Sequence, residues 1–223
     1  MTTRNRKSKD SQRQSLSAED WARAALDAMA AKGLDAVAVE PLARQLGVTK
    51  GSFYWHFPNR EALLEAALQR WEQDETEAVL ARVDAVAEPY ARIVALFKQA
   101  NSSYRSGRLY LAMAAAADHP AVHAIVERVS QRRLSYLFDC YRALGMAPRE
   151  ADHWSRFAYA TFVGNLQIRR DIPDAIPNGP AFTEYLKLMI KTLIPRARGE
   201  ESNTRPATED HPDVLPLRKT GSD

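Results

Sequence analysis

Apolar residues recur three or four positions apart along most of the chain, and this spacing predicts helices from about residue 17 to residue 195. The first block, residues 18–31, follows Ser17, which forms a near capping box with Asp20 at the third helical position. The strict alternation typical of strands is nearly absent. We therefore expect an all-α fold.

Two short helices with a tight turn between them follow the first helix. Pro41 fits only the first turn of the predicted helix 39–46. Gly47 stands where a helix end needs a positive φ, and Thr49 is placed to cap the next helix. These residues predict a helix-turn-helix arrangement.

The second of these short helices carries both core anchors and polar chemistry. Phe53 and Phe57 are four residues apart on one face and should anchor the helix to its own domain. The other positions are then free to meet a phosphate backbone and base edges; they are Thr49, Lys50, Ser52, Tyr54 and His56. The alternative is an ordinary solvated helix face.

The rest of the chain is read as further helices. Pro58 should stop the short helix, and Asn59 should cap a fourth helix that reaches Trp71. Residues 120–144 predict a long amphipathic helix. The segments 157–168 and 182–194 are apolar on more than one face, which predicts that a second copy of the chain covers them, with Gly164 allowing close approach. The alternative places both helices centrally within one subunit.

Both ends of the chain differ in composition from this helical part. Residues 1–16 are basic and almost free of apolar side chains, and residues 196–223 are polar with mixed charge, so both are expected to be disordered. The basic arm is either an extension that reaches a neighbouring minor groove or an untethered terminus.

Composition narrows the protein class. The chain is 45% hydrophobic, enough for a real core, but has no apolar run of membrane-spanning length and no secretory leader pattern, so we expect a cytoplasmic protein without a membrane partner. Its single cysteine, Cys140, excludes an internal disulfide and a multi-cysteine metal cage. A net charge of +3 does not by itself indicate nucleic acid.

Metal and catalytic signals are weak. His119, His123 and Glu127 have the spacing of a helical metal site, but Pro120 prefers the first helical position and leaves His119 at the cap. No catalytic triad order or phosphate-binding glycine loop is found. We therefore expect no metal, no cofactor and no catalytic residue, with an all-α enzyme as the alternative class.

The sequence LARQLGVTKGSFYWHFPNREALLEAAL, residues 42–68, resembles the DNA-binding segment of the TetR family of transcriptional regulators. The resemblance implies a three-helix DNA-binding domain over residues 17–72, joined by the fourth helix to a ligand and dimer domain over residues 73–195. Beyond residue 72 the chain is similar only in being helical and of suitable length.

The resemblance also implies site residues. Its DNA contacts fall on Arg44, Thr49, Lys50, Gly51, Ser52, Tyr54, Trp55, His56 and Arg60. Two departures are notable: Ala38 replaces the usual capping Thr or Ser before the second helix, and Glu40 stands where a basic residue would suit DNA better.

The implied mechanism is a ligand-controlled repressor. A homodimer, held by the last two helices, would place two reading helices in successive major grooves of a palindromic operator, and a small molecule in the larger domain would release it. The expected ligand-binding residues are large side chains of the middle helices: Phe97, Tyr104, Met113, His123, Trp154 and Phe157. The alternatives are ordinary core roles for these residues and a DNA-binding architectural protein without ligand control.

Overall fold

The structure, a computed structural model, describes residues 16–195 apart from the side chain of Tyr104. Within this range it contains helices and connecting loops, and no strand, as predicted. The N-terminal elements are α1 (Ala18–Lys32), the 3₁₀ turn η1 (Leu34–Ala36), α2 (Val39–Gln45), α3 (Lys50–Tyr54) and α4 (Arg60–Glu72). The predicted tail 196–223 and all but the last residue of the predicted arm 1–16 lie outside the described residues.

The remaining elements form the larger part of the molecule. They are the π-helical turn η2 (Gln73–Glu77), α5 (Ala78–Asp84), α6 (Pro89–Ala100), α7 (Tyr104–Ala115), α8 (Pro120–Ala143), α9 (Pro148–Asp171) and α10 (Gly179–Leu193). The fourth helix does not stop at residue 72, because η2 and α5 continue it to Asp84.

Local sequence signals explain the bounds of the first helices. Ser17 and Asp20 form the predicted capping box, in which the Asp20 amide donates to Ser17 Oγ at 3.2 Å and the Ser17 amide donates to Asp20 Oδ2 at 2.8 Å. Gly33 and Gly47 take φ values of 84° and 69°, which only glycine adopts without strain. Asn59 caps α4 through its side chain, as expected.

The core beneath α3 is aromatic. Phe53 is fully buried and meets Trp21 of α1 edge-on, with ring centroids 5.3 Å apart. Phe57, one turn further on, is also buried, so the predicted anchoring pair is confirmed. These contacts fix the orientation of α3 relative to α1.

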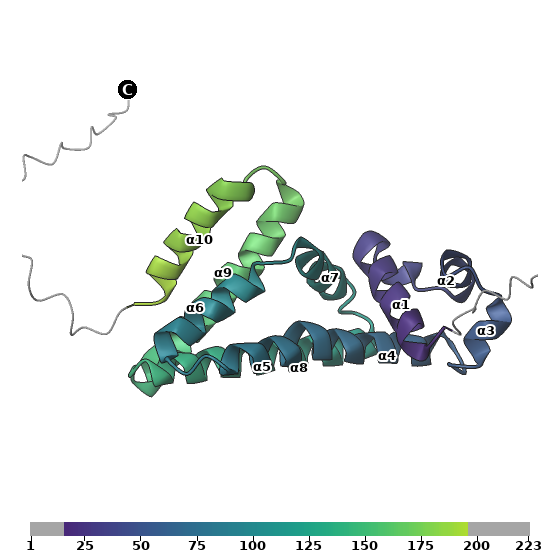
Figure 1. The fold of residues 1–223 in the computed structure, drawn as a ribbon, viewed down its shortest axis with the longest axis horizontal. Helices are drawn as coiled ribbons and strands as arrows, with labels where there is room; N and C mark the ends of the chain where they lie inside the picture. The colour runs from purple at the N-terminus through teal and green to yellow at the C-terminus, as the bar shows by residue number, and fades with distance from the viewer. Residues whose placement is uncertain (1–15, 196–223) are drawn as a thin grey trace, which may run out of the picture.

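The two parts of the molecule share a hydrophobic core. One cluster of buried residues runs from α1–α4 into α7 and the first half of α8, and a second joins α5, α6, the end of α8, α9 and α10. Arg105 of α7 pairs with Asp27 of α1, and Arg108 donates to the Ala30 carbonyl. Figure 1 shows α4 running along α8, with α2 and α3 at one end of the molecule and α9 and α10 at the other.

Cys140 lies in the second cluster. Burial raises the pKa of its thiol to about 12, so the nucleophilic thiolate is scarce near neutral pH. None of the helices between residues 16 and 195 combines the length and the apolar composition that crossing a membrane requires.

We predict that Phe53→Ala lowers the free energy of unfolding by about 3–5 kcal/mol, because it opens a cavity between α3 and α1. Trp55→Ala, two residues along the same helix end, should change it by less than about 0.5 kcal/mol, since 88% of Trp55 is exposed. Urea denaturation followed by circular dichroism measures both. Equal losses would show that Phe53 is not the anchor.

Candidate nucleic-acid interface and internal cavity

The surface of α3 that faces away from the core is polar and aromatic. Trp55 and Tyr54 are 88% and 56% exposed, unusual values for large aromatic side chains. Thr49, Lys50 and Gly51 are also exposed, and Ser52 and His56 are half-buried. Every predicted contact residue of this helix is therefore at least partly accessible, and α3 lies at one end of the molecule (Figure 1).

The cap of α3 differs from the sequence prediction. Thr49 has the extended backbone of an N-cap residue, but its side chain accepts no capping hydrogen bond. The prediction that Thr49 caps α3 through its side chain is therefore wrong, and its hydroxyl remains accessible. Ala38 leaves the start of α2 without a side-chain cap, as its methyl group requires.

Lys50 is paired within the domain. Its Nζ donates to Glu40 Oε1 of α2 at 2.8 Å, across the turn between the two helices. This hydrogen bond lowers the pKa of Glu40 and raises that of Lys50. Both side chains are more than half exposed, so the pair is weak and can exchange for another partner.

The two predicted arginines differ in position. Arg44 is exposed on the last turn of α2. Arg60 instead points into its own domain, where Nε donates to the Val37 carbonyl at 2.6 Å and one terminal nitrogen donates to the Leu34 carbonyl at 3.3 Å. The structure thus gives Arg60 an internal role, because its guanidinium holds the carbonyls of the η1 turn and of the loop before α2.

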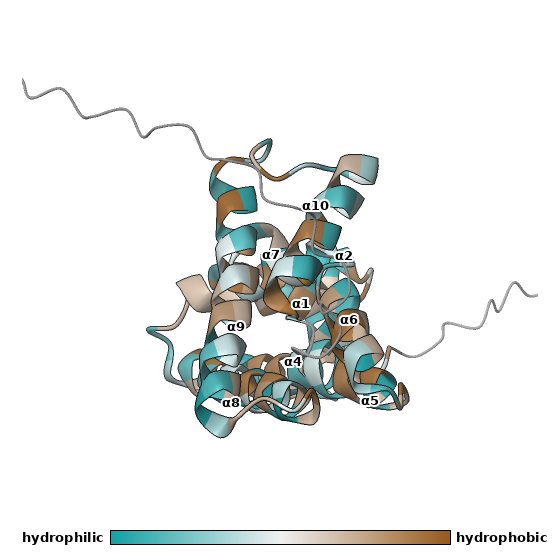
Figure 2. Ribbon diagram, turned by 90° about the vertical axis from the view of Figure 1, so that its left-hand side faces the viewer, coloured by the Kyte–Doolittle hydropathy of each residue, from teal (hydrophilic) through white to brown (hydrophobic). Residues whose placement is uncertain are grey.

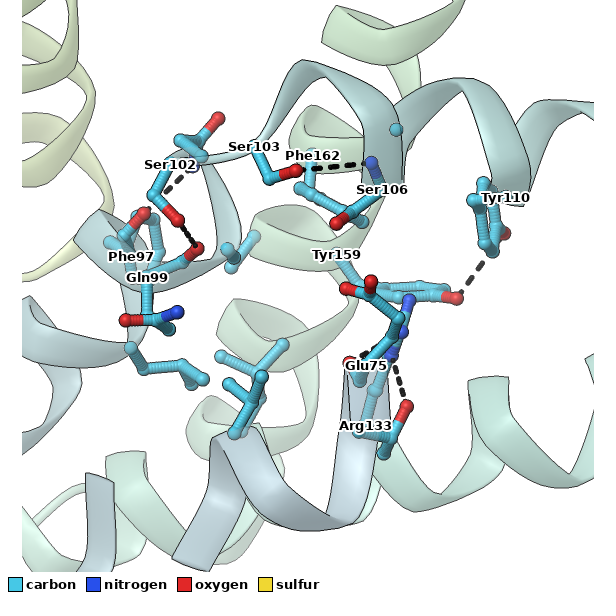
Figure 3. A pocket seen from close by; sticks show the side chains of 18 of the residues that line it. Glu75, Phe97, Gln99, Ser102, Ser103, Ser106, Tyr110, Arg133, Tyr159 and Phe162 are labelled. Carbon is cyan, nitrogen blue, oxygen red and sulfur yellow. Dashed lines mark hydrogen bonds between the residues drawn. The ribbon is translucent and has the colours of Figure 1, made fainter. Parts of the chain in front are cut away.

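A cavity of about 320 Å³ lies inside the larger part of the molecule. Residues of η2, α5, α6, α7, α8, α9 and α10 line it, and part of it opens to solvent. Figure 3 shows Phe97, Phe162 and Tyr159 around it, with Arg133 and Glu75 together at one end and the serines of the α6–α7 loop at another.

Of the expected ligand residues, Phe97 lines this cavity and four others do not. Met113 is fully buried in the core shared with α1, and Trp154 packs in the second core cluster, where its ring lies 6.4 Å from that of Tyr141. His123 and Phe157 are exposed. Residue size alone does not place a side chain at this cavity, because the phase of each helix decides which side chains turn inward. The side chain of Tyr104 lies outside the described part.

Arg133 is the residue of the cavity that sequence reasoning missed. Its Nε donates to Thr76 Oγ1 at 3.1 Å, and a terminal nitrogen donates to the Glu75 carbonyl at 3.0 Å. The guanidinium also lies 5.6 Å from the ring centroid of Trp71 and 5.8 Å from that of Tyr110. Arg133 therefore joins α8 to the π-helical turn and to α7.

A signal for Arg133 was present in the sequence. It lies four residues after Val129 and four before Leu137, so it falls on the apolar stripe of α8 that the sequence predicts. A charged residue in an apolar stripe indicates a functional or paired site.

Two tyrosine hydroxyl groups, of Tyr110 and Tyr159, lie near Arg133 at the polar end of the cavity. Tyr159 of α9 donates to Ser130 Oγ at 2.9 Å, and its hydroxyl lies 3.3 Å from that of Tyr110. Burial raises the pKa of Tyr110, so its hydroxyl keeps its proton and remains a donor as well as an acceptor.

The structure does not assemble the histidine spacing into a metal site. His119 is the N-cap of α8, as Pro120 predicted, and His123 Nε2 lies 3.9 Å from Glu127. Over residues 16–195 no group of three or more His, Cys, Asp or Glu side chains gathers as metal ligands.

Comparison with known proteins supports the reading of α2–α4. Residues 22–67 match the family model for bacterial regulatory proteins, tetR family. The chain is 35% identical over 86 residues to the tetracycline repressor protein class A from transposon 1721 of Escherichia coli, a match that covers 38% of this chain and 40% of that protein.

Two further proteins are similar to this chain over a longer range that includes helices beyond α4. The HTH-type transcriptional regulator BetI of Klebsiella pneumoniae is 27% identical over 154 residues, or 66% of this chain and 77% of that protein. The fold is similar to the crystal structure of a transcriptional regulator from Rhodococcus sp. Rha1, with a TM-score of 0.67 and 23% identity over 80% of this chain and 96% of that one.

We predict that Arg60→Ala lowers the free energy of unfolding by about 1–3 kcal/mol, because the carbonyls of Val37 and Leu34 lose their charged donor. Arg23→Ala is the control, since the Arg23 side chain is 53% exposed and pairs only with Asp20, and it should cost less than about 0.5 kcal/mol. Thermal and urea unfolding compare the two. Equal free energies of unfolding for the two variants would show that the contacts of Arg60 with the two carbonyls do not stabilise the domain.

Proposed function

Because this chain belongs to the TetR family of bacterial regulatory proteins, we propose that it regulates transcription by binding duplex DNA through α3. The observation that carries the proposal is the accessible surface of α3 beside a fully buried anchor, Phe53. A short helix held in this way can enter the major groove without unfolding its own domain.

The proposed DNA contacts keep the predicted surface residues. They are Arg44, Thr49, Lys50, Gly51, Ser52, Tyr54, Trp55 and His56. Lys50 is suited to a guanine edge, for which it would exchange its exposed partner Glu40. Arg60 is proposed to hold the loop before α2 in place rather than to bind phosphate.

We propose that two copies pair through α9 and α10. Phe157 and Ile168 of α9 and Leu188 of α10 are 53%, 42% and 60% exposed in the single chain. A Cβ atom added at Gly164, on the same face as Phe157, would meet nothing within 4 Å, which leaves room for a second helix. Figure 2 looks onto this end of the molecule and shows apolar segments on both helices. Exposed apolar patches of this kind mark protein interfaces.

Such a dimer would read a symmetric site. A two-fold axis places the two α3 helices in equivalent positions, so the operator would be a palindrome with half-sites about 34 Å apart or multiples of that spacing. Because its proposed partner is chromosomal DNA, we propose that the protein acts in the cytoplasm.

The cavity supports control by a small molecule. It is lined by η2, which continues directly into α4, the helix that packs on α1 in the DNA-binding part. A molecule that prefers one arrangement of η2 would also prefer one position of α4. The name of one relative, the tetracycline repressor, links that protein to a small molecule. The cavity favours this function over an architectural DNA-binding protein.

We predict that Lys50→Ala and Tyr54→Ala each weaken binding to DNA by about tenfold, since each removes one contact of α3. Full-length protein first selects its site from a random duplex pool, and gel-shift titration then gives the affinities. Lys98→Ala is the control, because Lys98 is also an exposed lysine but lies on α6, outside α3 and outside the proposed dimer helices α9 and α10. If the Lys50→Ala and Tyr54→Ala variants bind DNA as tightly as the control variant, α3 does not form the DNA interface.

We predict that the double variant Phe157→Glu/Leu188→Glu raises the dimer dissociation constant at least about 100-fold, because it places unpaired carboxylates in an apolar interface. Sedimentation velocity measures the change. Trp55→Glu, which changes an exposed apolar residue at the C-terminal end of α3, should leave the dimer intact. A dimer that survives the double variant would place the interface elsewhere.

A further inference from the structure

One end of the cavity holds a cation without an anionic partner. Three arginines of α8 face the helix that runs from α4 to α5. Arg128 pairs with Glu72 and Arg132 pairs with Glu77, whereas Arg133 donates to the neutral Thr76 hydroxyl and Glu75 carbonyl and interacts with the Tyr159 hydroxyl. Among the described residues, no carboxylate lies within ion-pair distance of Arg133. Burial lowers the pKa of Arg133, but an arginine side chain remains protonated.

The same end of the cavity holds an anion. Glu75 lies next to Arg133, and Figure 3 shows its carboxylate directed toward Tyr159 and the cavity. This carboxylate has no hydrogen-bond or ion-pair partner among residues 16–195. It acts on Arg133 only through space, by an electrostatic attraction. The cavity thus presents a donor group and an acceptor group side by side.

The other charged groups at the cavity are satisfied or exposed. Asp74 forms an ion pair with Arg70, in which Oδ2 lies 3.0 Å from Nε, and Arg82 is exposed to solvent. Leu80, Leu137, Met189 and Leu193 contribute apolar walls. The charge that a ligand meets at the polar end therefore comes mainly from Arg133 and Glu75.

This pairing selects against ligands with a single charge. A carboxylate placed at the polar end is attracted by Arg133 and repelled by Glu75, and an ammonium group meets the opposite combination. Either ion would lose its hydration for little net attraction. A hydroxyl or amide group loses less on transfer, and it can accept from Arg133 while donating to Glu75.

We propose that the cavity binds an uncharged amphipathic molecule whose hydroxyl or amide group bridges Arg133 and Glu75 while its apolar body fills the space between α5, α8 and α10. This proposal names the chemical class of the ligand. That the ligand acts as an effector rests on the function proposed above. Because Arg133 also holds Thr76 and the Glu75 carbonyl, this molecule competes at the contact that fixes η2.

Three probes that share a 4-butylphenyl body and differ in one polar group, and so in charge, test the proposal. At pH 7.5, 4-butylphenol is neutral, 4-butylbenzoate is an anion and 4-butylbenzylamine is a cation. Isothermal titration calorimetry on the full chain without DNA compares them. We expect the phenol to bind at least tenfold more tightly than either charged probe.

Two single substitutions should then change the preferred charge. Glu75→Gln leaves Arg133 alone, so the benzoate should gain at least tenfold relative to the benzylamine. Arg133→Gln leaves Glu75 alone and should reverse that order. The neighbouring pair supplies controls, because Arg132→Gln and Glu77→Gln change the same helices outside the cavity and should keep the wild-type ranking.

Arg133→Gln removes a guanidinium that binds three elements, so its folding must be checked by circular dichroism; Glu75→Gln tests the proposal without it. A wild-type preference for either charged probe overturns the proposal, as does binding of none of the three or an unchanged ranking in Glu75→Gln. A protein that selects DNA but prefers a charged probe refutes the ligand class alone. One that binds the phenol but selects no DNA refutes the proposed function alone.

Discussion

The contact between Arg133 and the π-helical turn is the interaction on which the two parts of the molecule depend. Hydrogen bonds to Thr76 and to the Glu75 carbonyl fasten η2 to α8 at the edge of the cavity. Since η2 continues α4, this contact fixes where the DNA-binding helices begin relative to the larger part. Turns of this kind often stand at functional sites, because one extra residue in the turn loosens the helical ladder.

Much of the fold could be predicted from the sequence because its signals are local. The capping box at Ser17, the positive φ at Gly47 and the anchoring by Phe53 follow from residue type and spacing alone, and all three are confirmed. The cap at Thr49 failed, since residue type indicates a possible hydrogen bond but not the rotamer that would form it.

The cavity could not be predicted in the same way, because it depends on how several helices pack together. Phe157 and Trp154 were sound candidates by size, yet the phase of α9 turns Tyr159 and Phe162 inward in their place. Arg60 shows the same limit, since its partners are carbonyls more than twenty residues away. Arg133 was the exception, because its place on the buried stripe of α8 is visible in the sequence.

The central claim is that the cavity and α3 are coupled through η2, and by linkage such coupling must appear in the DNA affinity. The most direct test measures the affinity of the full chain for its selected DNA site with and without saturating 4-butylphenol. We predict that the affinity falls at least about fivefold when the cavity is filled. An unchanged affinity at saturation would contradict the coupling.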